Sequence, residues 1–139
     1  MTEKERQKEK ELLLNVLKDG LPYGLQLQIT DVDGFTFNGE LLVLSKNWCR
    51  LNITDPVKRA KVKNQTIPLN YIYIKPYLRP MSSMTEEEKK EYENCYQSDD
   101  TTTATLLVDF YNKKHFDYRG LIPKGIAIAV TEENNPYKE

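Results

Sequence analysis

The spacing of apolar and polar positions first predicts a helix over residues 2–19. Thr2 and Glu5 have the spacing of a capping box at its start. Gly20 offers a left-handed C-cap, and Pro22 prevents the helix from continuing. The apolar face lies near the end of the helix and consists of Leu13, Leu14, Val16 and Leu17. The early turns are a solvated run of charges.

The period then changes to two, which predicts an antiparallel meander of three or four strands over residues 24–54. Asp33-Gly34 and Asn38-Gly39 read as turns between strands. Further strands are expected over residues 41–44 and 48–53. The first strand alternates polar residues with the apolar Leu25, Leu27 and Ile29.

The next segment is basic and then returns to a strand pattern. Residues 56–66 predict an exposed loop or a short edge strand that lysines protect from pairing. Residues 67–74 alternate β-branched and aromatic side chains, which predicts a strand. Two prolines are expected to keep residues 75–80 extended and irregular.

The second half predicts two helices. A second capping box, Thr85 with Glu88, opens a helix over residues 86–96. Its inner side is expected to carry Tyr92, Cys95 and Tyr96. An amphipathic helix over residues 103–115 follows from the spacing of Leu106, Leu107, Phe110 and Tyr111. The chain then ends in a compact turn-rich segment, a short strand and a loose polar tail, over residues 117–125, 126–130 and 132–139.

These elements predict one α+β domain over residues 1–139, with an N-terminal helix, an antiparallel sheet of four to six strands and two helices in the second half. A domain of 139 residues buries roughly two-thirds of its unfolded surface, so it needs no disulfide or metal. Cys49 and Cys95 fit no zinc spacing and are expected to be separate thiols. No metal or cofactor is predicted.

The composition favours a cytoplasmic protein without a membrane partner. The chain opens with charged residues rather than a signal peptide, and no apolar run approaches the ~20 residues of a membrane span. Twenty basic and 21 acidic residues give no overall attraction to nucleic acid. Nine tyrosines suit half-buried surfaces and interfaces, so a homodimer stays open.

A first candidate site lies at residues 71–79. Tyrosine rings could stack on bases while basic side chains hold phosphates, as in sites for nucleotides or single-stranded nucleic acid. The alternative is a strand that packs its tyrosines on the sheet. The residues in question are Tyr71, Tyr73, Lys75, Tyr77 and Arg79.

A second candidate site contains His115, the single histidine of the chain, with Asp117, Tyr118, Arg119 and Lys124. His115 and Asp117 could form a base and its orienting partner, but no Ser or Cys beside them carries a nucleophile motif. Arg119 and Lys124 could instead bind an anion. The structural alternative is that Asp117 and Arg119 fix the turn through hydrogen bonds.

The sequence therefore gives eight candidates for ligand binding and no catalytic or metal residue. The acidic residues near 86–88 and 99–100 are better explained as helix caps and a polar loop than as metal ligands. Cys95 lacks a local nucleophile signature. The eight candidates are Tyr73, Lys75, Tyr77, Arg79, His115, Tyr118, Arg119 and Lys124.

Two long segments of this sequence resemble a signature of small uncharacterised proteins. These proteins are encoded by phages, prophages and other mobile elements of Bacteroides-type gut bacteria. They are KPYLRPMSSMTEEE at residues 75–88 and HFDYRGLI at residues 115–122. Lys124-Gly125, the Glu-Asn-Asn-Pro-Tyr tail and the Leu21–Gly24 segment resemble it too. The likeness covers about half the chain, mainly residues 74–125, and brings no catalytic residue with it.

This resemblance implies an accessory factor that works inside an infected cell. Its targets would be host defence proteins, signalling nucleotides or the replication machinery. We therefore expect a non-enzymatic protein that binds a host protein or a small anionic ligand such as a nucleotide. A nucleic-acid-binding accessory protein that uses the basic run at residues 58–63 ranks second. A phosphoester hydrolase with His115 as acid or base ranks third.

Overall fold

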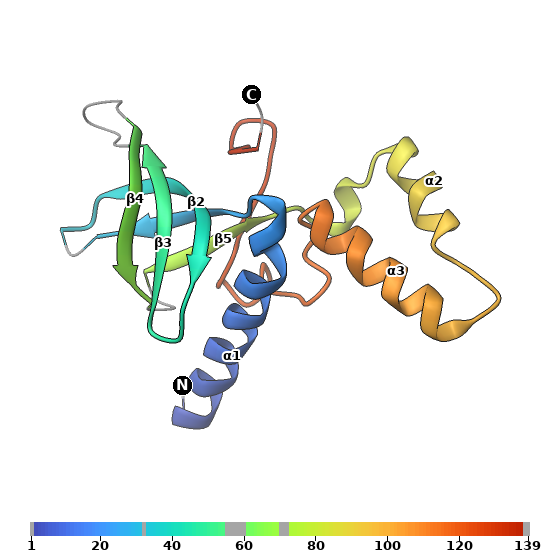
Figure 1. The fold of residues 1–139 in the computed structure, drawn as a ribbon, viewed down its shortest axis with the longest axis horizontal. Helices are drawn as coiled ribbons and strands as arrows, with labels where there is room; N and C mark the ends of the chain where they lie inside the picture. The colour runs from blue at the N-terminus through green and yellow to red at the C-terminus, as the bar shows by residue number, and fades with distance from the viewer. Residues whose placement is uncertain (1, 32, 55–60, 70–72, 138–139) are drawn as a thin grey trace.

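The computed structural model describes residues 2–31, 33–54, 61–69 and 73–137, and it shows the predicted α+β class (Figure 1). The helices are α1 (Glu3–Gly20), α2 (Glu86–Asn94) and α3 (Asp100–Lys113), with short 3-10 helices at Leu21–Tyr23 and Met81–Ser83. The strands are β1 (Gln26–Thr30), β2 (Thr36–Leu44), β3 (Trp48–Thr54), β4 (Lys61–Pro68), β5 (Ile74–Leu78) and β6 (Ile128–Ala129).

Helix α1 begins at the predicted capping box, in which Thr2 and Glu5 satisfy each other's backbone N–H groups. The predicted left-handed cap at Gly20 is wrong. The helix continues into a 3-10 turn, and the left-handed residue is Gly24, with φ 69°. Gly20 instead allows close packing, because a Cβ there would lie 2.8 Å from Cδ2 of Leu25.

The sheet has the strand order β4-β3-β2-β1-β5-β6. Strands β1 to β3 form the antiparallel meander predicted over residues 24–54, β4 extends it beyond those residues, and β5 pairs antiparallel with β1 on its free side. The last strand, β6, pairs parallel with β5, so the sheet is mixed rather than purely antiparallel.

Strand β2 runs through a position that the sequence predicted as a turn. Asn38-Gly39 lies inside the strand, and Gly39 is paired with Leu27 on one side and Ile53 on the other. A Cβ on Gly39 would lie 2.8 Å from Cγ2 of Ile53, so the glycine permits a close approach of side chains from β3. The predicted turn at Gly34 is present, with φ 86°.

The predicted strand over residues 67–74 is wrong at Leu69 and Tyr73, because β4 ends at Pro68 and β5 begins at Ile74, whereas residues 70–72 lie outside the described part. Strand β5 occupies the segment that was predicted to be irregular. Pro76 is tolerated there because the antiparallel register turns its nitrogen away from β1, and β6 pairs only from Tyr77 onward. The basic segment gives an edge strand from Lys61, whereas residues 55–60 lie outside the described part.

Two separate clusters of apolar side chains hold the molecule together. The main core lies between α1 and one face of the sheet, and includes Leu17, Leu25, Leu27, Leu41, Leu51, Ile74 and Leu121. The smaller cluster lies between α2, α3 and the segment that follows, and consists of Cys95, Phe110 and Phe116 with Met84, Tyr92, Leu107 and Tyr111 around it. Tyr96 was predicted to point inward, but it is 54% exposed.

Residues 81–114 form an arm that extends from the sheet on the far side of α1 (Figure 1). Within the arm, α3 begins earlier than predicted, because the Asp99 side chain caps it by accepting the Thr102 N–H at 3.0 Å. None of the described helices is long and apolar enough to cross a membrane. The chain returns from the arm to form β6 and a tail, which docks on the sheet through Tyr137 rather than remaining loose.

Candidate functional site

The arm joins the sheet at a junction made of Arg79 and residues 115–117. The Arg79 N–H donates to the His115 carbonyl at 2.7 Å, and the Asp117 N–H donates to the Arg79 carbonyl at 2.9 Å. Arg79 and Phe116 thus form a short parallel bridge. Four of the eight predicted site residues meet in or beside this junction: Arg79, His115, Tyr118 and Arg119.

The guanidinium of Arg79 makes three hydrogen bonds within the molecule. It donates to both carboxylate oxygens of Glu88, each at 2.6 Å, and to the carbonyl of Ser83 at 3.1 Å. Its plane also lies 4.3 Å from the ring of Phe116. The hydrogen bonds from Arg79 lower the pKa of Glu88 to about 2. Arg79 therefore fastens α2 to β5, and its charge is balanced by a carboxylate.

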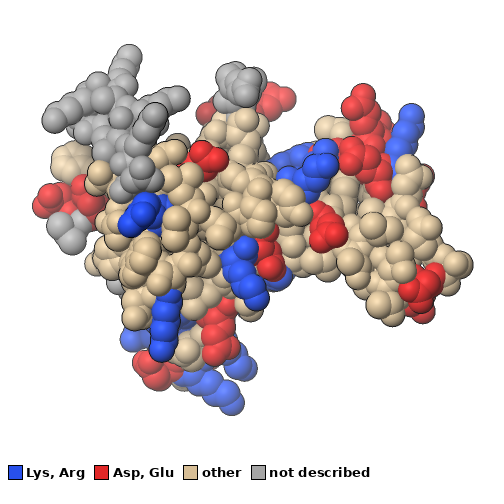
Figure 2. Space-filling view, viewed as in Figure 1, with Lys and Arg blue, Asp and Glu red and all other residues tan. Residues whose placement is uncertain are grey.

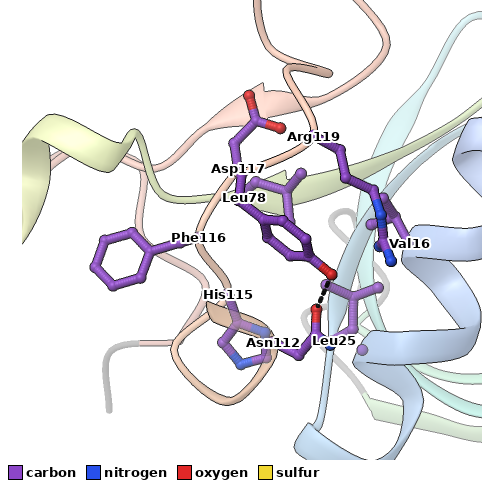
Figure 3. Close-up of a pocket in the computed structure, with 10 residues that line it drawn as sticks. Val16, Leu25, Leu78, Asn112, His115, Phe116, Asp117 and Arg119 are labelled. Carbon is purple, nitrogen blue, oxygen red and sulfur yellow. Dashed lines mark hydrogen bonds between the residues drawn. The ribbon is translucent and has the colours of Figure 1, made fainter. Parts of the chain in front are cut away.

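Arg119 is engaged in the same way, on the other side of the junction. It pairs with Asp19 at the end of α1 and lies 4.7 Å from the ring of Tyr118. The Tyr118 hydroxyl donates to the side-chain oxygen of Asn112 at 3.0 Å, as the dashed line in Figure 3 shows. Its ring stacks on Tyr111 at 5.0 Å. These contacts tie α1, α3 and the turn after α3 together.

His115 does not form a catalytic pair with Asp117. Both carboxylate oxygens of Asp117 accept backbone N–H groups, from Leu121 at 2.8 Å and Ile122 at 2.9 Å, so Asp117 fixes the turn. The His115 ring stacks on Tyr137 with centroids 4.1 Å apart. Burial lowers the pKa of His115 to about 4, and the charge of Arg79 acts in the same direction. His115 is therefore neutral at pH 7 and a weak base.

The space beside these residues is too small for a nucleotide. A cavity of about 10 Å³ lies between α1, β1 and the end of α3, and its walls include Val16, Leu25, Asn112, His115 and Arg119 (Figure 3). That volume holds about one water molecule, whereas sites for small-molecule ligands usually measure several hundred Å³.

Lys124 lies in a different place, a groove of about 250 Å³ beside α1. Two carboxylates, Glu5 and Glu9, line this groove together with Lys8, so it has no excess of positive charge. In the part of the chain that the structure describes, the cations of Arg79, Arg119 and Lys124 thus stand in three separate settings. A site for a small anion would require them around one concave surface.

The predicted stacking platform on β5 is not formed by the described residues. Tyr73, Lys75 and Tyr77 share the face of β5 that points away from the main core. The Tyr77 ring is buried, and its hydroxyl donates to Asn38 at 2.7 Å and accepts from Gln28 at 3.3 Å. Tyr73 is 42% exposed, but Tyr71 and residues 58–60 of the basic run at residues 58–63 lie outside the described residues.

The arm exposes large apolar side chains that the sequence did not reveal. Tyr96, Leu106 and Val108 of the arm are 54%, 38% and 41% exposed. The Sγ of Cys95 contacts the carbonyl of Leu106 at 3.6 Å, which places Tyr96 and Leu106 on adjoining turns of the arm. Sequence spacing had assigned Tyr96 and Leu106 to inner faces.

The arm is also acidic. Residues 81–114 contain eight carboxylates and four lysines, a formal charge of −4, whereas the rest of the chain carries +3 and the total is −1. Only a few of these groups pair within the arm, such as Lys89 with Glu86 at 3.1 Å and Lys114 with Glu91 at 3.5 Å. Figure 2 shows carboxylates at both edges of the arm.

The described residues offer no cluster of three acidic, histidine or cysteine side chains that could hold a metal ion. Cys49 and Cys95 are both free and buried, one in each apolar cluster, and burial raises the pKa of Cys49 to about 11. Comparisons of the chain with protein-family models, with curated proteins and with solved structures find no match.

Proposed function

We propose that this chain is a non-enzymatic accessory protein of a phage or other mobile element, and that it binds a host protein through the arm. The observation that carries the proposal is the projecting acidic arm with Tyr96, Leu106 and Val108 exposed. The likeness of residues 75–88 and 115–122 to mobile-element proteins supports the origin. Host defence proteins are the class of target that we favour.

The state of the other candidate residues supports a protein partner over a small anion. Arg79 and Arg119 each have a carboxylate partner, and the cavity beside Arg119 holds about one water molecule. His115 is neutral and has no aligned carboxylate among the described residues, so it is a poor acid or base for hydrolysis. A protein surface needs neither a deep cavity nor an unpaired cation.

The chemistry of the arm specifies the kind of partner. An exposed tyrosine near an exposed leucine resembles the centre of protein interfaces, where aromatic residues supply much of the binding energy. Carboxylates around this centre favour a partner surface that is apolar in the middle and basic at the rim. The same carboxylates repel nucleic acid.

The test is affinity capture from a lysate of the natural host, with mass spectrometry of both proteins and small molecules. We expect one host protein in stoichiometric amount with the wild-type chain. The double variant Tyr96→Ser, Leu106→Ser should lose it, because the centre of the interface is removed. Tyr73→Ser is the matched control, since Tyr73 is an exposed tyrosine on the sheet.

Retention of the host protein by the Tyr96→Ser, Leu106→Ser variant would show that another surface binds. Recovery of a nucleotide without a protein partner would contradict the proposal and favour a sequestering site. Salt-sensitive capture of nucleic acid would instead support the second interpretation of the sequence.

A further inference from the structure

The ladder between β1 and β5 contains a hydrogen-bonding position that a third segment fills. The backbone N–H of Thr30 donates to the carbonyl of Tyr73 at 2.9 Å. Hydrogen-bonded pairs recur at every second residue of an antiparallel ladder. The register therefore brings Gln26 opposite Tyr77 at another such position. The backbone pairing of β1 with β5 nevertheless ends one residue before this position.

The hydroxyl of Tyr137 occupies that position. The Gln26 N–H donates to the Tyr137 hydroxyl at 3.1 Å, and this hydroxyl donates to the Tyr77 carbonyl at 2.7 Å. A hydroxyl can accept and donate at once, so it satisfies both backbone groups. The ring stacks on His115, with planes 12° apart. Gln26 N–H, Tyr77 C=O and the His115 ring therefore form a slot, which we call the tyrosine slot.

The segment that carries Tyr137 to the slot is held weakly. Residues 131–135 are all exposed. The Asn134 side chain reaches the carbonyl of Ala129 at only 3.4 Å. Asn135 accepts the Tyr137 N–H at 2.9 Å, which folds Asn135-Pro136-Tyr137 into a turn that presents the ring. Among the described residues of the tail, most of the docking therefore comes from one side chain on a local turn, and such an element can leave and return as a unit.

We propose that the tyrosine slot is a peptide-binding site, filled in cis by the tail and open in trans to a tyrosine on an Asn-Pro-Tyr turn of another protein. The tyrosine slot recognises both the ring and the hydroxyl of a tyrosine side chain. A phenylalanine would keep the stacking but leave two backbone groups unpaired, and a serine would supply a hydroxyl without a ring. The inference does not depend on the partner of the arm.

The tail limits which segments can enter. A short flexible connection holds a tethered group at an effective concentration in the millimolar range. An outside segment displaces the tail only if the ratio of its concentration to its dissociation constant exceeds the same ratio for the tail, so at ordinary concentrations it must bind the empty slot much more tightly than the tail does. The same arithmetic makes tail exchange between two copies a minor event.

The test uses the full-length chain with Tyr137→Ala, which empties the slot, and a synthetic peptide of residues 131–137 as the probe. In NMR titrations, the Gln26 amide should shift saturably in the variant and stay unchanged in the wild-type chain. The same peptide with phenylalanine in place of tyrosine should bind at least about tenfold more weakly, because the bridging hydroxyl is gone. No shift at several millimolar peptide, or equal binding of the two peptides, would overturn the proposal.

A second variant covers the case in which Tyr137→Ala does not fold. Tyr137→Phe keeps the ring on His115 and removes only the hydroxyl. We expect the Gln26 amide to exchange with solvent about five- to tenfold faster than in the wild-type chain. The Thr30 amide, bonded to Tyr73 in the same ladder, should keep its rate. An unchanged rate at Gln26 would show that the hydroxyl does not hold the slot.

Discussion

At the scale of single residues, Arg79 holds the two parts of the molecule together. Its backbone bridges to residues 115–117, and its side chain reaches Glu88 on α2. Both members of this ion pair are largely buried, and the geometry is bidentate. Such pairs are strong while complete, but removing one partner leaves an uncompensated charge away from water.

We predict that Glu88→Gln lowers the free energy of unfolding by about 2–3 kcal/mol, because Arg79 is left without its counter-charge. Urea denaturation at pH 7 measures the change. The control is Glu86→Gln, which removes the exposed partner of Lys89 and should change stability by less than about 0.5 kcal/mol. Equal effects of the two variants would mean that the buried pair adds nothing over an exposed one.

His115 makes stability depend on pH in the same direction as Glu88, because the pKa of each group is lowered in the folded chain. The unfolded histidine has a pKa of 6.5, whereas the folded one has a pKa of about 4. Between these values the unfolded chain binds more protons, so stability is complete above pH 6.5 and is lost as the pH falls toward 4. Glu88 adds to the loss only below its unfolded value of 4.5, since its folded pKa is about 2.

We predict that the free energy of unfolding falls by about 2 kcal/mol between pH 7 and pH 5, from protonation of His115 in the unfolded chain. The variant His115→Asn should lose most of this dependence, and asparagine suits the left-handed backbone at this position, where φ is 62°. Because the chain has one histidine, its ring protons report the folded pKa directly by NMR. A folded pKa near 6.5 would contradict the burial of the ring.

At the scale of elements, the arm and the sheet have separate apolar clusters. The main core is built from α1, strands of the sheet and the segment around Leu121, whereas α2 and α3 share a small cluster around Phe110. Elements with few buried contacts open at lower free energy than the rest of a domain. The arm is therefore expected to open locally while the sheet remains folded.

The variant Phe110→Ala tests this separation. We predict that amides of α2 and α3 exchange at least about a hundredfold faster, because truncating a buried phenylalanine costs about 3–5 kcal/mol. Amides of β2 and β3 should change far less. Leu106→Ala truncates an exposed neighbour on α3 and is the matched control. Equal acceleration in the sheet would show that arm and sheet unfold as one unit, which hydrogen-exchange mass spectrometry can distinguish.

Elements that depend on residues close together in the sequence were predictable from it. Both capping boxes lie where their spacing predicted, and the alternation of Leu25, Leu27 and Ile29 identified the inner face of β1. Gly39 was misread as a turn because its role depends on Ile53 in another strand. Strand β5 was not predicted because proline usually disrupts a strand. Pro76 is tolerated only in the register with β1, which the sequence alone does not give.

At the scale of the whole molecule, the candidate site could be predicted only as a set of residue types. The sequence brought attention to Arg79, His115 and Arg119, and these do gather where the arm meets the sheet. Their partners could not be predicted, because Arg119 meets Asp19 across 100 residues and Tyr137 meets Gln26 across 111. A basic residue that already pairs with a carboxylate of the same chain is a poor candidate for binding an anionic ligand.

Charge is distributed unevenly between the same two parts. The arm carries −4 and the rest of the chain +3, although the sum over the chain is −1. A composition near neutrality therefore conceals an acidic arm on a chain whose remaining residues carry a net positive charge. Complementary charge acts mainly on the rate of association, and salt screens it.

Reversing two carboxylates of the arm should slow the association of the captured host protein. Glu93 lies one turn before Tyr96 and Asp109 one turn after Leu106, so Glu93→Lys with Asp109→Lys changes charge beside the exposed apolar residues. We predict an association rate at least about tenfold lower at low salt, and a much smaller difference at 0.5 M salt, because the Debye length falls well below 10 Å.

The matched control reverses the same number of charges on α1, with Glu9→Lys and Glu11→Lys. The net charge of the two double variants is identical, so a response that depends only on total charge would affect them equally. A response that depends on where the charge lies would affect only the arm variant. Surface-based binding kinetics over a range of salt separate the two cases. Equal slowing in both variants would show that the arm does not guide the approach of the host protein, even if the host protein were a true partner.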